Sequence, residues 1–321
     1  MTSGNAGAHK LVNVNGRVRE GERVVVVTDY TMRDIAELVI IEAREAGAEV
    51  TTCVMPMRKH DGQEPPAPVA AAMREANVIF SPVRFSITHT RAMRAALETG
   101  TRAILMTAYT DELLECPALI ETDFEAQEAV CHRIGAAFTN GRSVRLTSPK
   151  GTDLSFSIEG MTANVLTNIP KPGQLAPVPD IEVNVVPVTG SAEGRLIADA
   201  SVPYLGIGVL DEPVVCAIEA GYIREMTGGA QADVLRTDLE SHNDHHCFNV
   251  AELGVGLNPN ARLSGAMLDD EGVLGTIHIG IGTSFTLGGD IVAPTHYDLL
   301  MWAPTIEVDG VVIQRDTEIL V

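Results

Sequence analysis

The first 140 residues alternate between short apolar segments and amphipathic segments, and this alternation constrains the fold more than any other feature. Residues 23–30, RVVVVTDY, form a run of β-branched residues typical of a buried strand. Residues 31–47 follow with a helical pattern, with Thr31 as a candidate N-cap and Gly47 at the end. The strand and helix patterns continue in the segments 49–56, 67–76, 77–84, 89–100, 102–107 and 123–139. Strands that alternate with helices predict a parallel sheet with helices on both faces.

After residue 142 the pattern changes to short alternating segments separated by turns rich in glycine and proline. The clearest predicted strands lie in the segments 143–160, 183–190 and 193–202. One stretch, 230–241, has a helical pattern. We therefore expect a doubly wound, flavodoxin-like α/β domain over residues 1–142 and a mostly antiparallel β domain over residues 143–321. No G-x-G-x-x-G follows the first predicted strand, which disfavours a dinucleotide site.

The charge balance and the cysteines exclude several classes of protein. The chain of 321 residues has 23 basic and 43 acidic side chains, a formal charge of −20 at pH 7. This charge argues against nucleic acid, whose phosphates require Lys and Arg. Five cysteines without C-x-x-C spacing disfavour a disulfide framework and a cysteine zinc site. The first residues, MTSGNAGAHK, lack the apolar region of a signal peptide, and no apolar run is long enough for a membrane span, so we expect a cytoplasmic protein.

Late in the sequence, the predicted strand PTHYDLLMW contains a histidine and an aspartate separated by one residue. Because side chains alternate along a strand, His296 and Asp298 point to one side and Tyr297 to the other. Glu252 lies in an apolar, glycine-rich stretch, and His278 lies between two isoleucines. Buried carboxylates are costly unless paired or bound to a metal, so these residues predict a metal site in the β domain. The alternative is a satisfied core histidine and a turn acid.

A second group of histidines occurs in the segment SHNDHHCF. His242, His245 and His246 form an H-x-x-H-H pattern. The surrounding composition is that of a polar loop or a helix end, with no apolar frame to hold the ligands. We therefore rank this cluster below the strand residues as a candidate metal site.

A further histidine follows the third predicted strand of the α/β domain. His89 lies in a loop of the kind in which open α/β sheets bind ligands, and a neutral histidine there can act as a general base. Arg84 and Arg91 flank it, and they can either meet an anionic substrate or pair with acids. The alternative for this segment is that Thr88 or His89 caps the next helix.

The order and spacing of several motifs along most of the chain match those of a known family. The motifs are THTRA, GTDLSFSI, NIPKPGQL, EGRLIADASVPYLG, GVGLNPNARL, HIGIGTSFTLGGD and HYD. Together they resemble the aminopeptidase T family of metallopeptidases and its short relatives, which include 2,5-dihydroxypyridine 5,6-dioxygenase. The resemblance implies an enzyme that forms a homo-oligomer, at least a dimer, and acts on a small molecule or a short peptide.

The same resemblance implies a set of metal ligands. The peptidases build a two-metal site from two glutamates, two histidines and an aspartate, and four of these match Glu252, His278, His296 and Asp298. Gln174 stands at the place of the other glutamate, and its neutral amide is a poor ligand. We therefore expect one tightly held divalent metal, which is Zn, Mn, Co or Fe(II), and at most a weak second one.

Two reactions follow from these ligands, and we rank hydrolysis first. A metal-activated water would cleave an amide bond, and the acidic Glu252 together with His278 favours this reaction. The alternative is ring cleavage of a hydroxylated N-heterocycle by a ferrous dioxygenase. The resemblance implies that the dioxygenase binds iron with two histidines and one carboxylate, and that one of these histidines stands at the position of Glu252. The catalytic histidine of the dioxygenase aligns with His89. A non-enzymatic, metal-bearing scaffold is the third and least favoured hypothesis.

Overall fold

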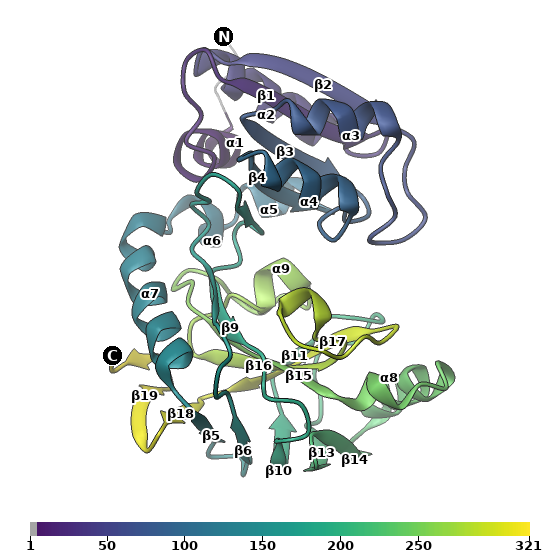
Figure 1. Cartoon of the computed structure of the whole chain (residues 1–321), viewed down its shortest axis with the longest axis vertical. Helices are drawn as coiled ribbons and strands as arrows, with labels where there is room; N and C mark the ends of the chain where they lie inside the picture. The colour runs from purple at the N-terminus through teal and green to yellow at the C-terminus, as the bar shows by residue number, and fades with distance from the viewer. Residues whose placement is uncertain (1–4) are drawn as a thin grey trace. The chain divides into compact units, whose positions relative to one another are not determined.

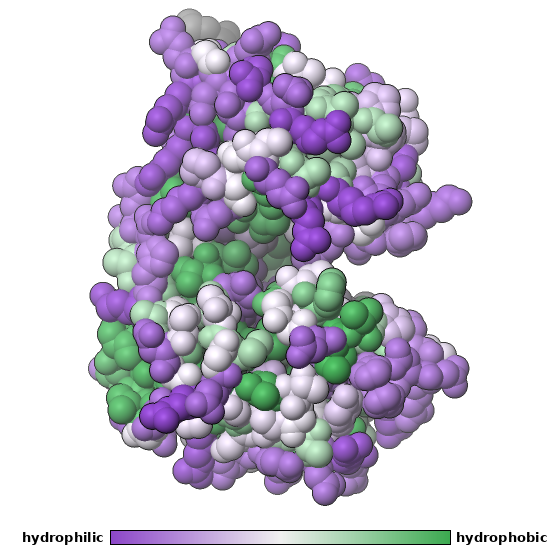
Figure 2. All heavy atoms as spheres, in the orientation of Figure 1, coloured by the Kyte–Doolittle hydropathy of each residue, from purple (hydrophilic) through white to green (hydrophobic). Residues whose placement is uncertain are grey.

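The computed structural model describes residues 5–321, and its contacts divide the chain into two compact units (Figure 1). The first unit consists of Met1–Glu125 and Leu166–Pro179, and the second consists of Ala126–Val165 and Asp180–Val321. Hydrophilic side chains cover much of the visible surface of each unit, as expected for a chain with an excess of acids (Figure 2). No helix within residues 5–321 is long and apolar enough to cross a membrane.

The first unit is built on a parallel sheet with the strand order β2-β1-β3-β4-β8. The strands are β1 (Arg23–Asp29), β2 (Glu49–Met55), β3 (Val78–Val83), β4 (Arg102–Thr107) and β8 (Leu175–Ala176). Every pairing in this sheet is parallel. From β1 the chain passes to β2 on one side, and it then crosses back to place β3 on the other side of β1. The predicted doubly wound arrangement is therefore confirmed.

Helices cover both faces of this sheet. Val25 and Val27 pack in one apolar cluster with Met73 of α3 and Met93 of α4, whereas the alternate valines of β1 are buried outside that cluster, on the face toward α2. The helices of the first unit are α1 (Ala6–Lys10), the π-helical turn Leu11–Asn15, α2 (Arg33–Glu45), α3 (Ala67–Arg74), α4 (Arg91–Glu98), α5 (Asp111–Leu114) and α6 (Pro117–Ile120).

The predicted ends of α2 are right at one terminus and wrong at the other. Gly47, with a φ of 83°, follows the C-cap, which only glycine adopts without steric cost. The predicted N-cap is wrong, because Met32 occupies that position and the Thr31 hydroxyl donates to Asp29 Oδ1 at 2.6 Å. Asp29 therefore competes successfully for the hydroxyl that the sequence pattern assigned to the helix.

The second unit contains two main antiparallel sheets, as the sequence predicts. One has eight strands in the order β14-β13-β10-β6-β5-β18-β19-β20, and the other has the order β17-β16-β15-β9-β7. The strands of the first sheet are β5 (Ser143–Thr147), β6 (Asp153–Ser157), β10 (Glu193–Ala198), β13 (Val214–Glu219), β14 (Tyr222–Thr227), β18 (Thr305–Val308), β19 (Val311–Arg315) and β20 (Glu318–Ile319). The pair β11 (Ser201–Val202) and β12 (Gly208–Val209) forms a separate ribbon.

The five-stranded sheet carries the candidate site. Its strands are β7 (Asn164–Leu166), β9 (Glu182–Val185), β15 (Val250–Gly256), β16 (Thr276–Gly282) and β17 (His296–Trp302). Every residue of β15 and β16 is buried, so both faces of these central strands are covered. The helical segments of the unit are α7 (Phe124–Asn140), α8 (Ala230–Ser241), α9 (Met267–Asp270) and the 3₁₀ turns His245–Phe248 and Phe285–Leu287. The helix predicted over residues 230–241 is confirmed as α8.

The two compact units differ from the predicted ranges 1–142 and 143–321 in two places. Most of α7 belongs to the second unit, where a Cβ at Gly135 would lie 2.5 Å from Val165 Cγ2. Residues 166–179 return to the first unit because β8 pairs in parallel with β4. A strand of two residues carries no hydrophobic period, so the sequence pattern gives no sign of this return.

Candidate metal centre

Three neighbouring strands bring the four predicted metal ligands onto one face of the five-stranded sheet. The register pairs Glu252 of β15 with Gly280 of β16, and it pairs Gly280 with Asp298 of β17. His296 lies opposite Gly282, two positions along from Gly280, so its side chain points to the same face. His278 also lies two positions from Gly280 and points the same way.

Glycines opposite the ligands provide the space for the imidazole rings. A Cβ on Gly254, which pairs with His278, would lie 1.9 Å from the Nε2 atom of that histidine. A Cβ on Gly280 would lie 2.8 Å from the Cε1 atom of His296. Any larger residue at these two positions would displace a ring, so the glycine-rich sequence is a requirement of the site.

The ligand atoms converge within the sheet face. His296 Nε2 lies 2.9 Å from Glu252 Oε2 and 3.5 Å from Asp298 Oδ1. His278 Nε2 lies 3.9 Å from Glu252 Oε1. Glu252, His278 and Asp298 are buried, while the His296 side chain is 24% exposed. The trio of Glu252, His296 and Asp298 therefore has one partly accessible member through which a small molecule can reach it.

Sequence reasoning missed Glu182, which β9 adds to this cluster. Glu182 Oε2 lies 3.3 Å from His278 Nε2, and Glu182 forms a second trio with Glu252 and His278. Its other oxygen accepts a hydrogen bond from Asn184 Nδ2 at 2.7 Å. The signal that could have found Glu182 is the one that identified Glu252: a lone carboxylate in an apolar strand, here IEVNVV.

Two more carboxylates and a tyrosine adjoin the cluster. Asp180 precedes β9, Glu271 follows α9, and the two form a third trio with Glu182. The Tyr204 hydroxyl donates to Asp298 Oδ2 at 2.7 Å and lies 3.0 Å from Glu271 Oε1. Five buried carboxylates thus face only two imidazoles, and this imbalance of charge calls for protons or cations.

The buried acids divide into two classes by pKa. Burial raises the pKa of Asp180 and of Glu271 well above the ordinary range, and raises that of Glu182 to about 7. Burial also acts on Asp298 and Glu252, but the adjacent imidazoles outweigh it and hold both pKa values below the ordinary range. Glu252 and Asp298, the two acids that flank His296, are therefore the ones that ionise readily.

The pKa values of His278 and His296 are raised, whereas burial alone lowers the pKa of a histidine. Burial lowers the pKa of His278, but the carboxylate of Glu252 and the other surrounding carboxylates raise it to about 10. The pKa of His296 is also raised despite burial, chiefly by the charge of Asp298. The surrounding carboxylates therefore favour the charged, doubly protonated form of both rings.

The residues present fit a divalent metal. Three buried atoms of the cluster have no hydrogen-bond partner among the described residues: Glu182 Oε2, His278 Nδ1 and Asp298 Oδ1. His296 Nδ1 lies 2.7 Å from the carbonyl oxygen of Thr283, which can only accept, so Nδ1 carries the proton and Nε2 faces the carboxylates. Imidazole nitrogen with carboxylate oxygen suits Fe(II), Zn, Mn or Co.

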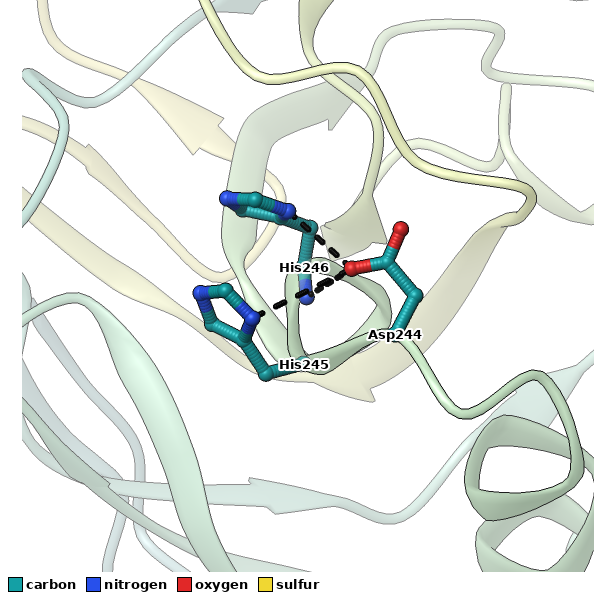
Figure 3. A group of neighbouring side chains, drawn as sticks. All are labelled: Asp244, His245 and His246. Carbon is teal, nitrogen blue, oxygen red and sulfur yellow. Dashed lines mark hydrogen bonds and ion pairs between the residues drawn. The ribbon is translucent and has the colours of Figure 1, made fainter.

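The histidine-rich segment forms a separate, more exposed group. Asp244, His245 and His246 lie together at the turn after α8, as Figure 3 shows. Asp244 Oδ1 accepts from the backbone N–H of His246 and lies 3.0 Å from its Nδ1, so local hydrogen bonds already satisfy this carboxylate. His242 does not join the group, because its Nε2 lies 3.4 Å from Asp238 Oδ2. The segment is a helix end, as its composition predicts.

The residues predicted for catalysis and substrate binding lie in the first unit. His89 is exposed in the turn between β3 and α4. The predicted alternative of a cap at Thr88 or His89 is wrong, because Thr90 Oγ1 accepts from the Met93 N–H and caps α4. Arg91 is exposed and forms an ion pair with Glu64 at 3.2 Å. The backbone N–H of Arg84 donates to Asp29 at 2.7 Å, while the Arg84 residue as a whole is exposed.

Gln174 also lies in the first unit, whereas the four predicted ligands lie in strands of the second unit. It is exposed in the turn before β8, and its side-chain oxygen accepts from the Lys171 N–H at 3.0 Å. The carboxylate that adjoins His278 is instead Glu182, from the strand that follows.

The doubly wound unit and the buried ligand cluster together are features of a metalloenzyme-like fold. More narrowly, the chain belongs to the 2,5-dihydroxypyridine 5,6-dioxygenase family, whose NicX model matches residues 9–321. It is 26% identical over 225 residues to the 2,5-dihydroxypyridine 5,6-dioxygenase of Pseudomonas putida KT2440, a match that covers 66% of this chain and 62% of that protein. The resemblance noted in the sequence is thereby confirmed.

Solved structures show the same fold. The structure of 2,5-dihydroxypyridine dioxygenase from Pseudomonas putida KT2440 matches with a TM-score of 0.85 and 20% identity, covering 98% of this chain and 96% of that one. AmpT, the aminopeptidase T of Thermus thermophilus, matches with a TM-score of 0.69 and 18% identity, covering 99% of both chains. The fold of this chain is thus shared by a dioxygenase and a peptidase.

Proposed function

We propose that this chain is a ferrous, ring-cleaving dioxygenase that acts on a hydroxylated N-heterocycle such as 2,5-dihydroxypyridine. The sequence prediction ranked amide hydrolysis first, but family membership and the name of the Pseudomonas putida relative favour the alternative. The single observation that carries the proposal is the convergence of Glu252, His296 and Asp298 on one face of the sheet. These three residues would hold the metal, and positions not taken by protein would serve the substrate and oxygen.

The protein would hold the metal and keep the side chains of its ligands in fixed orientations. The chemistry that ferrous iron would supply here is activation of dioxygen toward an electron-rich ring. The Thr283 carbonyl fixes the tautomer of His296, and the Tyr204 hydroxyl fixes the orientation of Asp298. The resemblance implies that the dioxygenases have a histidine at the position of Glu252. In this chain, His278 lies beside Glu252 and would supply the second imidazole of the site.

We assign the proton transfer and the substrate contacts to residues of the first unit. His89 would remove a proton from a ring hydroxyl, since it lies in an exposed turn at the carboxyl end of β3. Arg84, at the end of the same strand, lies beside Asp29 at the end of β1, where the strand order reverses. Open α/β sheets bind ligands at such a point, so Arg84 and Arg91 are proposed to bind an anionic substrate.

Amide hydrolysis is the second candidate, and one observation favours it. Glu182, Glu252 and His278 supply a further trio of ligand atoms that shares Glu252 with the first trio. A bridging carboxylate between two adjacent ligand sets is a feature of hydrolases that use two metals. A site rich in carboxylates also suits zinc, manganese or cobalt as well as iron.

The test begins with metal content per chain, measured by elemental mass spectrometry on protein purified anaerobically. The iron-loaded protein is then mixed with 2,5-dihydroxypyridine while oxygen uptake and the ring absorbance are followed. We expect stoichiometric oxygen consumption and loss of the ring band, neither of which occurs with the His296→Ala variant. Hydrolysis of amides by the zinc, manganese or cobalt form, without oxygen uptake by the iron form, would establish the second candidate instead.

A further inference from the structure

We propose that Asp180, Glu182 and Glu271 form a second, all-oxygen site for a divalent cation. One oxygen from each carboxylate lies within 4.8 Å of the others. Asp180 lies two residues before Glu182, the first residue of β9, and Glu271 follows directly after α9. The site belongs to the second unit alone and does not use Gln174.

Burial makes these three carboxylates expensive without a cation. Asp180, Glu182 and Glu271 are 3%, 5% and 8% exposed. Asp180 Oδ1 and Glu182 Oε2 are buried and have no hydrogen-bond partner among the described residues. No ion pair described between residues 5 and 321 gives any of the three a Lys or Arg partner, and the basic group nearest Glu182 is His278 at 3.3 Å. The Asp180 oxygen, buried without a donor, points to a ligand in the space that it shares with Glu182 and Glu271.

Neutral neighbouring groups hold the carboxylates in place. Asn184 donates to Glu182 Oε1 at 2.7 Å, and Oε2 lies 3.3 Å from His278 Nε2. The Tyr204 hydroxyl lies 3.0 Å from Glu271 Oε1. A Cβ on Gly272 would lie 2.9 Å from Asp180 Oδ1, so the glycine allows the chain after Glu271 to close against Asp180. Neutral partners that orient a carboxylate are typical of the groups around metal ligands.

The chemistry of the ligands selects the class of cation. Three carboxylates without nitrogen or sulfur suit a hard divalent ion such as Mg²⁺, Mn²⁺ or Ca²⁺. The trio of Glu252, His296 and Asp298 includes an imidazole and suits a transition metal. Because this second site is defined by cation binding alone, it does not depend on which reaction the enzyme catalyses.

The experiment counts bound Mn²⁺ on the whole chain after treatment with a chelator and dialysis. Free Mn²⁺ is followed by electron paramagnetic resonance during a titration at pH 7.5. We expect the wild-type chain to bind two equivalents. The variants Asp180→Asn and Glu271→Gln should each lose one equivalent and keep the one that depends on His296, which also shows that they fold. The His296→Ala variant should show the converse loss.

A matched control is Asp269→Asn, which removes a half-buried acid of α9 outside the trio and should leave both equivalents. Two equivalents in Asp180→Asn and Glu271→Gln would overturn the proposal. The absence of any bound Mn²⁺ in His296→Ala would also overturn the proposal. This result does not depend on whether the other two variants fold. The proposed reaction is tested separately by oxygen uptake, so failure of one does not imply failure of the other.

Discussion

The hydroxyl of Tyr204 donates to Asp298 Oδ2 at 2.7 Å and lies 3.0 Å from Glu271 Oε1. One phenol therefore joins a candidate ligand of the imidazole-containing site to the acidic trio beside it. The contact occupies Oδ2 and leaves Asp298 Oδ1, which has no hydrogen-bond partner among the described residues, facing His296 at 3.5 Å. Tyr204 thus orients Asp298 without using the oxygen that a metal would take.

The variant Tyr204→Phe should weaken metal binding by about tenfold, since groups that orient metal ligands typically contribute 10- to 100-fold. The measurement is competition with a chelator of known affinity at fixed pH. The matched control is Tyr297→Phe, because that hydroxyl donates to Asp238, outside the ligand cluster. Equal metal affinity in Tyr204→Phe and wild type would show that the phenol has no part in positioning Asp298.

The variant His296→Ala should lose the transition metal and all turnover while its far-UV circular dichroism stays native. His296 is the partly exposed member of its trio, so its removal deletes a ligand without opening the buried interior of β15 and β16. The control is His246→Ala in the exposed group after α8, which should retain the metal. Full metal occupancy in His296→Ala is the result that contradicts this assignment.

Metal binding should release protons, and apparent affinity should rise with pH. The pKa of His278 is raised to about 10 and that of His296 is raised too, so the carboxylates favour the charged form of both rings in the metal-free site. A metal takes the neutral ring, so each coordinated histidine must give up its proton, and this cost falls as pH approaches the raised pKa. Calorimetric titration in two buffers of different ionisation enthalpy measures the release. Heats that do not depend on the buffer would contradict the prediction.

The variant His89→Ala should keep its metal and lose turnover by about 100-fold or more, the usual contribution of a general base. The N-terminal cap of α4 should stay intact, because Thr90, not His89, caps this helix. The contrasting variant is Thr90→Ala, which loses the bond to the Met93 N–H and about 1 kcal/mol of stability while turnover at low temperature persists. Unchanged turnover in His89→Ala would remove this histidine from the mechanism.

Local patterns predicted the elements and part of the site. The β-branched run that became β1 and the helical pattern of α8 were predicted nearly to their ends. The alternation of side chains along a strand was enough to place His296 and Asp298 on one face. Glu252 and His278 were identified because a titratable residue in an apolar strand needs a partner. All of these inferences depend on properties that act within a few residues of the chain.

The pairing of distant strands was decided only by the tertiary structure. Glu182 meets His278 because β9 pairs with β15, whose other neighbour is β16, although β9 lies about seventy residues earlier in the chain. The same folding brings Glu271 to Asp180 and returns β8 to the first sheet. Sequence periodicity fixes which way a side chain points along its own strand. Which strand lies alongside depends on the summed packing of the whole sheet, and no local pattern encodes that choice.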